Sequence, residues 1–268
     1  DNDLNQEVAM ELLNDAGFTV DLASNGQIAL EMLRTDGADY DIILMDMQMP
    51  VMDGLTATRE IRKDPRLQHI PVVAMTANAL QGARDRCMAA GMNDHVAKPI
   101  EPEKLWEALL KWVKPRPSTA ASTLKVKPRA VAEVKLPTGV TGLNVAEGLR
   151  RVLGRQPLYL SLLRKFVAGQ RSVAMEISKA LNDNLWESAE RLTHTLKGVS
   201  GTIGASEIQQ RAEQLETAIG ERLSRQEIDT RLDRLQVLLG DLVTQLEGQL
   251  SEEGSKPAGL GDQDQLKA

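Results

Sequence analysis

Two hydrophobic periodicities alternate along the first 113 residues. Apolar residues recur every three or four positions over five stretches, which is typical of amphipathic helices, and short apolar runs between them are typical of strands. The predicted helices cover residues 4–16, 26–35, 54–63, 79–90 and 102–113. The predicted strands are Phe18–Ala23, Asp41–Met45, Pro71–Met75 and His95–Ala97. This alternation predicts an α/β domain with a parallel sheet and helices on both faces.

After residue 114 the pattern changes to a Pro-, Ala- and Lys-containing stretch and then to helical periodicity alone. The later helices are expected near Asn144–Leu153 and at Pro157–Leu181, Asn184–Gly204, Ser206–Ile219 and Ser224–Leu250. Four long amphipathic helices with short connections predict an antiparallel four-helix bundle. We therefore expect a first domain at residues 1–114, a flexible linker at 115–138, an all-α domain at 139–250 and a disordered polar tail at 251–268.

Composition narrows the class of protein. The chain has 268 residues, enough for two domains, and its 3% aromatic content predicts aliphatic cores. A net charge of −6 without a basic patch argues against nucleic-acid binding. Cys87 is the single cysteine, which suits a reducing compartment such as the cytoplasm. The sequence contains no apolar run long enough to span a membrane, so we expect a cytoplasmic segment, whatever anchors its parent protein.

A histidine stands out in the predicted helix Asn184–Gly204. The apolar stripe of this helix is Leu185, Ala189, Leu192, Leu196, Val199 and Ile203, spaced 4, 3, 4, 3, 4. His194 lies two positions from both Leu192 and Leu196, which predicts that it points to the opposite, solvent side. Gly198 and Gly201 follow on that side, and each costs about 1 kcal/mol relative to alanine within a helix.

The two glycines suggest clearance for another protein's surface beside the ring, with Lys197 adding positive charge for an anion. The alternatives are an ordinary solvated histidine and glycines that mark a helix end. A metal site is disfavoured, because neither a cysteine nor a second histidine lies nearby in sequence.

The stretch His194-x-x-Lys197-Gly198 with small residues after it resembles the histidine-containing phosphotransfer (HPt) domain, over about residues 140–250. The resemblance implies that His194 carries a phosphoryl group, that Lys197 contacts it, and that receivers dock over Gly198 and Gly201. Glu216 on the next helix is a candidate to orient the ring. A solvated helix carboxylate is the favoured interpretation of Glu216.

The first domain has a second candidate site where its predicted strands end. Asp46, Thr76 and Lys98 each follow a buried run, and ligands bind at the carboxyl ends of parallel strands. A carboxylate can attack phosphorus to form an acyl phosphate, while a hydroxyl, an ammonium group and a hard divalent cation stabilise the phosphoryl oxygens. Taken singly, the three residues are equally compatible with a turn, a helix cap and a solvated lysine.

Taken together, these residues resemble the response-regulator receiver domain, a flavodoxin-like doubly wound fold, over about residues 1–114. The matching motifs are Asp46-Met-Gln-Met-Pro50, Met52-Asp53-Gly54, Thr76-Ala77 and Lys98-Pro99. The resemblance implies that Asp46 is the phosphoacceptor and that Thr76 and Lys98 contact the phosphate. It also implies a Mg²⁺ ion held by Asp1, Asp46 and the backbone carbonyl of Gln48.

The sequence departs from the receiver pattern in two ways. The first strand and one acidic residue of the family are absent, which predicts a gap in the sheet between Phe18–Ala23 and Asp41–Met45 and a sequence cut from a longer protein. His95 stands where receivers usually carry a switching Tyr or Phe. It is either a switch residue or simply a histidine at a strand edge.

The order of the two domains resembles the C-terminal half of a bacterial hybrid sensor histidine kinase. That resemblance implies a two-component phosphorelay from a kinase core, in the same protein or a dimer partner, to Asp46, then to His194, and then to a downstream response regulator. The alternative is an interaction module that is not phosphorylated. A self-contained ATP-dependent kinase is disfavoured, because the sequence has no glycine-rich nucleotide loop; the parent protein is expected to be the kinase.

Overall fold

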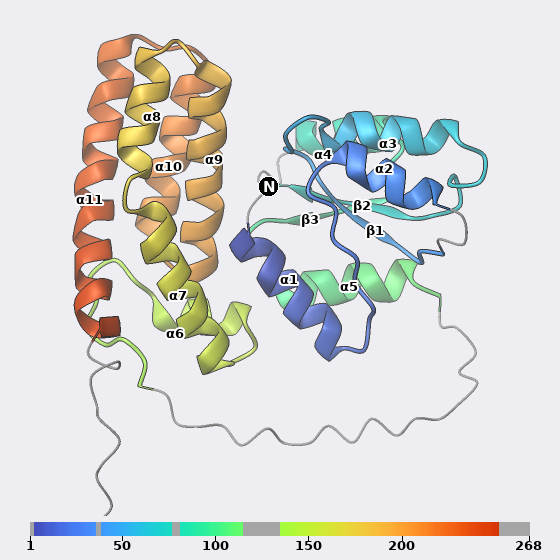
Figure 1. Cartoon of the computed structure of the whole chain (residues 1–268), viewed down its shortest axis with the longest axis horizontal. Coiled ribbons are helices and arrows are strands. Elements are labelled where there is room, and N and C mark those ends of the chain that lie inside the picture. Colours follow the sequence, from blue (N-terminus) through green and yellow to red (C-terminus); the bar gives the residue numbers. More distant parts are fainter. Residues whose placement is uncertain (1–2, 36–38, 77–80, 115–134, 252–268) are drawn as a thin grey trace, which may run out of the picture.

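The computed structural model describes residues 3–35, 39–76, 81–114 and 135–251. Its first part contains three strands and five helices (Figure 1). In chain order they are α1 (Asp3–Asp15), α2 (Gly26–Arg34), β1 (Ile43–Asp46), α3 (Gly54–Lys63), β2 (Val72–Thr76), α4 (Gln81–Ala89), β3 (Asp94–Ala97) and α5 (Pro102–Trp112). Most of the predicted linker (115–134) and the predicted tail from residue 252 lie outside the described residues.

The described strands form one parallel sheet in the order β1-β2-β3. Along β2 the side chains alternate between the two faces, as the two-residue period of a strand requires. Val73 and Met75 join the core that includes α1 and α5, whereas Val72 and Ala74 join the core that includes α2 and α3. Figure 1 shows helices on both faces of the sheet, which confirms the predicted α/β architecture.

Short-range polar contacts fix where the helices on one face begin. Asn25 accepts a hydrogen bond from the backbone N–H of Ile28 at 3.0 Å, and Asp53 accepts one from Thr56 at 2.7 Å. Such side-chain caps satisfy backbone donors at a helix start. Gly54 then allows α3 to approach β1, because a Cβ at this position would lie 2.1 Å from the backbone oxygen of Asp46.

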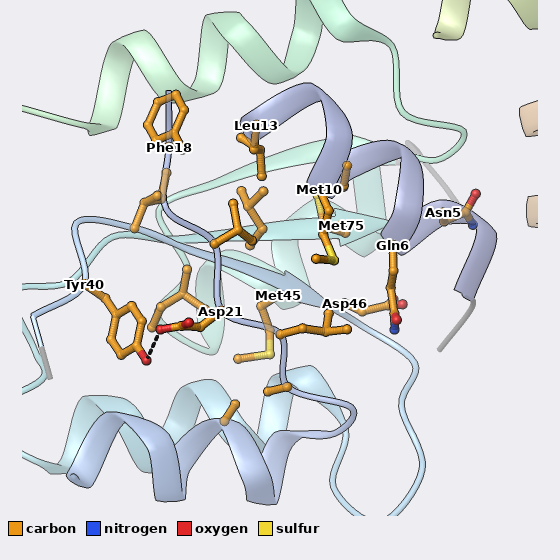
Figure 2. A pocket seen from close by; sticks show the side chains of 18 of the residues that line it. Asn5, Gln6, Met10, Leu13, Phe18, Asp21, Tyr40, Met45, Asp46 and Met75 are labelled. Atoms are coloured by element: carbon orange, nitrogen blue, oxygen red, sulfur yellow. Dashed lines mark hydrogen bonds between the residues drawn. The ribbon is translucent and has the colours of Figure 1, made fainter. Parts of the chain in front are cut away.

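The segment Phe18–Ala23 is not a strand, so this prediction was wrong. A strand needs a hydrogen-bonding neighbour, and a cavity of about 260 Å³ separates this segment from β1. Its wall includes the segment itself, β1 and one side of α1, together with residues of α2 and α5 (Figure 2). The cavity lies where the sequence predicted a gap, and it leaves β1 at the edge of the described sheet.

The second part of the chain is entirely helical. Its helices are α6 (Val145–Arg151), α7 (Gln156–Gln170), α8 (Val173–Asn182), α9 (Trp186–Ile203), α10 (Ser206–Gly220) and α11 (Arg225–Ser251). Helices α8 to α11 run side by side as a bundle (Figure 1), which confirms the predicted bundle. None of the helices in the described ranges is both long and apolar enough to cross a membrane.

The predicted single helix Pro157–Leu181 was wrong, because the chain breaks between α7 and α8. The spacing of the buried positions does not reveal the break. These positions run Phe166, Gln170, Val173, Ile177 and Ala180, with the spacing 4, 3, 4, 3 of one continuous helix, although Gln170 is polar. Hydrophobic periodicity alone therefore cannot locate this boundary.

Helix α1 belongs to the α/β part but also packs against the helical part (Figure 1). Leu4, Val8 and Leu12, spaced one turn apart, are buried in a core that continues into the bundle. Thr202 on α9 donates a 2.6 Å hydrogen bond to the side chain of Asn5. The two parts of the chain therefore share an interface built on α1.

Candidate functional site

Three of the predicted site residues of the α/β part lie at the carboxyl edge of the sheet. Asp46 ends β1, Thr76 ends β2, and Lys98 follows β3 directly. The Nζ of Lys98 donates a hydrogen bond to Oδ2 of Asp46, and both side chains are largely buried. An ammonium group is thus held against the carboxylate that is the candidate nucleophile.

Thr76 completes this edge with a hydroxyl group. The residue is only 3% exposed, and its Oγ1 has no hydrogen-bond partner within the described residues. A buried hydroxyl without a partner costs free energy, of the order of 1–3 kcal/mol. An anionic oxygen placed beside Asp46 and Lys98 would meet both a cation and a hydroxyl donor.

The metal-ligand prediction is only partly within the described residues, because Asp1 lies outside them. Asp46 contributes a carboxylate, and its Oδ1 accepts a 3.3 Å hydrogen bond from the backbone N–H of Gln48. Carboxylate and carbonyl oxygens are the donors that Mg²⁺ takes. Among the described residues, however, no group of three acidic, His or Cys side chains gathers to form a complete metal site.

His95 lies inside β3, opposite Ala74 of β2. Its side chain is about one quarter exposed, and Nδ1 lies 3.8 Å from Oδ1 of Asp94. Asp94 in turn accepts hydrogen bonds from Lys111 at 2.7 Å and Trp112 at 2.9 Å on α5. The neighbourhood of His95 therefore joins β3 to α5, and a switching role for the ring stays a prediction.

His194 is buried in the structure, so the predicted solvent-facing ring was wrong. Its side chain is 7% exposed. The ring faces α10, where its Nδ1 lies 2.6 Å from Oε1 of Glu216, and Lys197 donates to Oε2 of the same carboxylate at 2.5 Å. One carboxylate therefore holds the side chains of both His194 and Lys197 on α9.

Glu216 is a structural partner of His194, so its favoured interpretation as a solvated carboxylate was wrong. Its side chain is 13% exposed. Burial by itself would raise the pKa of Glu216, but the hydrogen bonds and charges of His194 and Lys197 outweigh it and lower the pKa. Glu216 is thus ionised at neutral pH, and its carboxylate can accept a hydrogen bond from a protonated Nδ1 of His194.

The two glycines near His194 have different neighbours. A Cβ on Gly198 would lie 3.1 Å from the side-chain nitrogen of Asn5, so this glycine faces α1 of the α/β part. A Cβ on Gly201 would lie 2.9 Å from the side chain of Gln209 on α10, inside the bundle. Gly198 thus makes room for Asn5 of α1 and Gly201 for the bundle's own packing, and a docking role for the two glycines stays a prediction.

Comparison with known families agrees with both halves of this geometry. The response regulator receiver domain family matches residues 1–110, and the Hpt domain family matches residues 161–256. The chain carries a receiver domain followed by an Hpt domain. Asp46, Thr76 and Lys98 belong to the receiver domain, and His194, Lys197 and Glu216 belong to the Hpt domain.

Relatives of the chain include sensor and hybrid histidine kinases. The signal transduction histidine-protein kinase BarA of Escherichia coli (strain K12) is 30% identical over 87% of this chain and 24% of its own length. The sensor histidine kinase GacS of Pseudomonas protegens is 29% identical over 82% of the chain and 23% of its own length. The chain thus spans about a quarter of the length of these curated relatives. A receiver and an Hpt domain in such proteins indicate two-component phosphorelay signalling.

Similar solved structures include two receiver domains. The receiver domain of sensor histidine kinase PA1611 from Pseudomonas aeruginosa PAO1, with magnesium in its active-site cleft, is 43% identical over 42% of this chain and 90% of its own, with a TM-score of 0.38. The complex of the Saccharomyces cerevisiae phosphotransfer protein Ypd1 with the receiver domain of Ssk1 matches at 28% identity over 42% of this chain and 83% of that chain, with a TM-score of 0.39.

Sequence reasoning missed the contacts of α1 with the Hpt domain. Asn5 and Thr202 form one of them, and nothing in either residue's local sequence pairs it with the other. The described structure brings them together across 197 positions.

Proposed function

We propose that this chain relays a phosphoryl group from a histidine kinase core to Asp46, from Asp46 to His194, and from His194 to an aspartate of a separate response regulator. The observation that carries the proposal is that one chain holds both a buried Asp46–Lys98 pair at a sheet edge and a histidine fixed by a carboxylate. We also propose that a histidine kinase core is the donor, that a response regulator is the final acceptor, and that the relay takes place in the cytoplasm.

The contacts of His194 support a role as nucleophile. When Nδ1 carries the proton and donates a hydrogen bond to Glu216, Nε2 keeps the lone pair that attacks phosphorus. The new N–P bond forms as the P–O bond of the acyl phosphate breaks, and Asp46 leaves as a carboxylate. Glu216 then balances the positive charge that develops on the ring, and Lys197 lies one turn from the phosphoryl group.

The contacts of Asp46 support a role as acceptor. Lys98 balances the charge of the carboxylate, and Thr76 offers its unpaired hydroxyl to a phosphoryl oxygen. We expect Asp46, the carbonyl of Gln48 and Asp1 to hold Mg²⁺, which when bound neutralises charge on the phosphoryl oxygens. Adding MgCl₂ to the isotope-labelled chain should shift the backbone resonances of Gln48, and Asp46→Asn should weaken that shift.

The relay is tested on the whole chain by labelling each site separately. With a kinase core as donor, His194→Gln should retain label on Asp46 but pass none to a response regulator, and Asp46→Asn should receive none. With phosphoramidate as the donor to His194, Asp46→Asn should prolong the lifetime of phosphohistidine, because the internal acceptor is removed. Full relay flux in either variant contradicts the proposal. A wild-type chain that takes no label from any donor favours the unphosphorylated interaction module.

A further inference from the structure

Helix α1 of the receiver domain lies over the part of α9 that follows His194. His194, Gly198 and Thr202 are spaced four residues apart and therefore share one face of α9. Asn5 of α1 accepts a hydrogen bond from Thr202 and lies within contact distance of Gly198. Glu216 of α10 holds the Nδ1 edge of the ring. The face next to His194 is thus covered by the chain's own receiver domain.

Ion pairs surround this contact on the side of α7. Glu7 on α1 lies 2.8 Å from Lys165, and Glu11 lies 3.1 Å from Arg155. Asp15, one turn further along α1, also pairs with Arg155. The acidic edge of α1 therefore meets basic groups at the start and along the length of α7. These pairs are partly exposed, so each contributes little alone but orients the helix.

We propose that α1 is a lid over the His194 surface, held by the pairs of Glu7 and Glu11 with Lys165 and Arg155, and that an external receiver must displace it to reach His194. The inference rests on the proposed function in one respect. Only if the relay operates do the internal receiver and the downstream regulator bind the same face of the Hpt domain in turn. It follows that weakening the ion pairs exposes His194 without changing any residue of the histidine site.

Accessibility of His194 can be measured without phosphotransfer. Diethylpyrocarbonate transfers an ethoxycarbonyl group to an unprotonated imidazole nitrogen, and mass spectrometry reads each histidine separately. The exposed His69 serves as an internal reference in the same chain. Combining Lys165→Glu with Arg155→Glu should raise the modification rate at His194 about threefold to tenfold, since each exposed pair is weak, and leave the rate at His69 unchanged.

Two further variants distinguish a lid from general loosening. Arg171→Glu reverses a charge in an ion pair with Glu247 within the Hpt domain and should leave the rate at His194 unchanged. Adding Glu7→Lys, Glu11→Lys and Asp15→Lys to the double variant restores opposite charges at all three pairs and should return the rate toward wild type. An unchanged His194 rate in the double variant, an equal rise with Arg171→Glu, or no rescue overturns the lid. If the accessibility results hold but the chain shows no phosphotransfer, the proposed relay is overturned and the lid is not.

Discussion

Glu216 links the chemistry of the histidine site to the stability of the bundle. The same carboxylate accepts from His194 and from Lys197, and all three side chains are largely buried. Removing Glu216 would take away the carboxylate that both His194 and Lys197 contact, which is costlier than losing an exposed pair. The residue therefore affects both the tautomer of the ring and the packing of α10 on α9.

Glu216→Gln should lower the free energy of unfolding by about 1–2 kcal/mol at pH 7, because a charged hydrogen-bond acceptor is lost. The pKa of Glu216 is lowered in the folded state, so its stabilisation is present above its ordinary pKa and is lost as the pH falls through the lower folded value. The difference between variant and wild type should thus stay constant from neutral pH down to about pH 5 and shrink below that.

Urea unfolding across this pH range measures the difference. Glu213→Gln, an exposed carboxylate one turn before Glu216 on α10, is the matched control and should change stability little. Equal losses in the two variants, or a gap that widens in acid, would contradict the assigned partners of Glu216.

The contacts between site residues were predictable from the sequence where the order of strands alone brings the residues together. The carboxyl ends of parallel strands share one edge, so the meeting of Asp46 and Lys98 follows from the order of strands. The pairing of His194 with Glu216 depends instead on how α10 is rotated against α9. Helical periodicity places His194 opposite the apolar stripe. That side of α9 is nevertheless covered, because α10 packs against His194 and α1 packs against Gly198 and Thr202.

At the scale of elements, periodicity predicted which segments are helical better than where they interact. The stripe of α9 placed Ala189, Leu196 and Val199 in the core, as the structure has them. The segment Phe18–Ala23 has the pattern of a strand, yet forms none beside the cavity. A strand forms only when an adjacent strand accepts and donates its backbone hydrogen bonds. A local sequence pattern therefore cannot predict a strand where no adjacent strand is present.

Gly198 offers a test of how α9 and α1 meet. Gly198→Leu should slow transfer between the two domains, because the new side chain projects toward Asn5. It should not unfold the bundle, because leucine favours the helical state over glycine by up to about 1 kcal/mol. Phosphotransfer rates and thermal unfolding of the same sample separate the two effects.

A helical glycine elsewhere in the bundle supplies the control. Gly240 on α11 is exposed, and no atom lies within 4 Å of a Cβ placed there. Gly240→Leu should leave the phosphotransfer rate unchanged, and it should raise stability as leucine does in place of any exposed helical glycine. If Gly198→Leu transfers as fast as wild type, the clearance at Gly198 has no part in docking.

At the scale of the whole chain, α1 ties the fold of the receiver domain to access at the Hpt domain. One side of α1 lines the cavity beside β1, where Gln6 lies near Asp46 (Figure 2). Other residues of α1 join the core that continues into the bundle. Any change that shifts α1 against the sheet must therefore also change its contact with α9.

The interface of α1 combines an apolar contact with ion pairs, and the two respond to salt in opposite ways. Leu4 and Val8 are buried, and salt does not weaken apolar burial. The pairs of Glu7 with Lys165 and Glu11 with Arg155 are partly exposed and are screened as the Debye length falls from roughly 10 Å at 0.1 M to 3 Å at 1 M salt. Ionic strength is therefore a way to loosen the lid without mutation.

Raising NaCl from 0.05 to 0.5 M should increase the diethylpyrocarbonate modification rate at His194 relative to His69 by about twofold to fivefold, the range expected when weak surface pairs are screened. The variant with Lys165→Glu and Arg155→Glu has already lost these pairs, so its rate should be high at low salt and should not rise further. Sodium sulfate, which strengthens apolar burial, should open wild type less than NaCl of equal ionic strength. A wild-type rate that is independent of NaCl would show that apolar packing alone holds α1 over the histidine face, and the ion pairs would then have no part in controlling access to it.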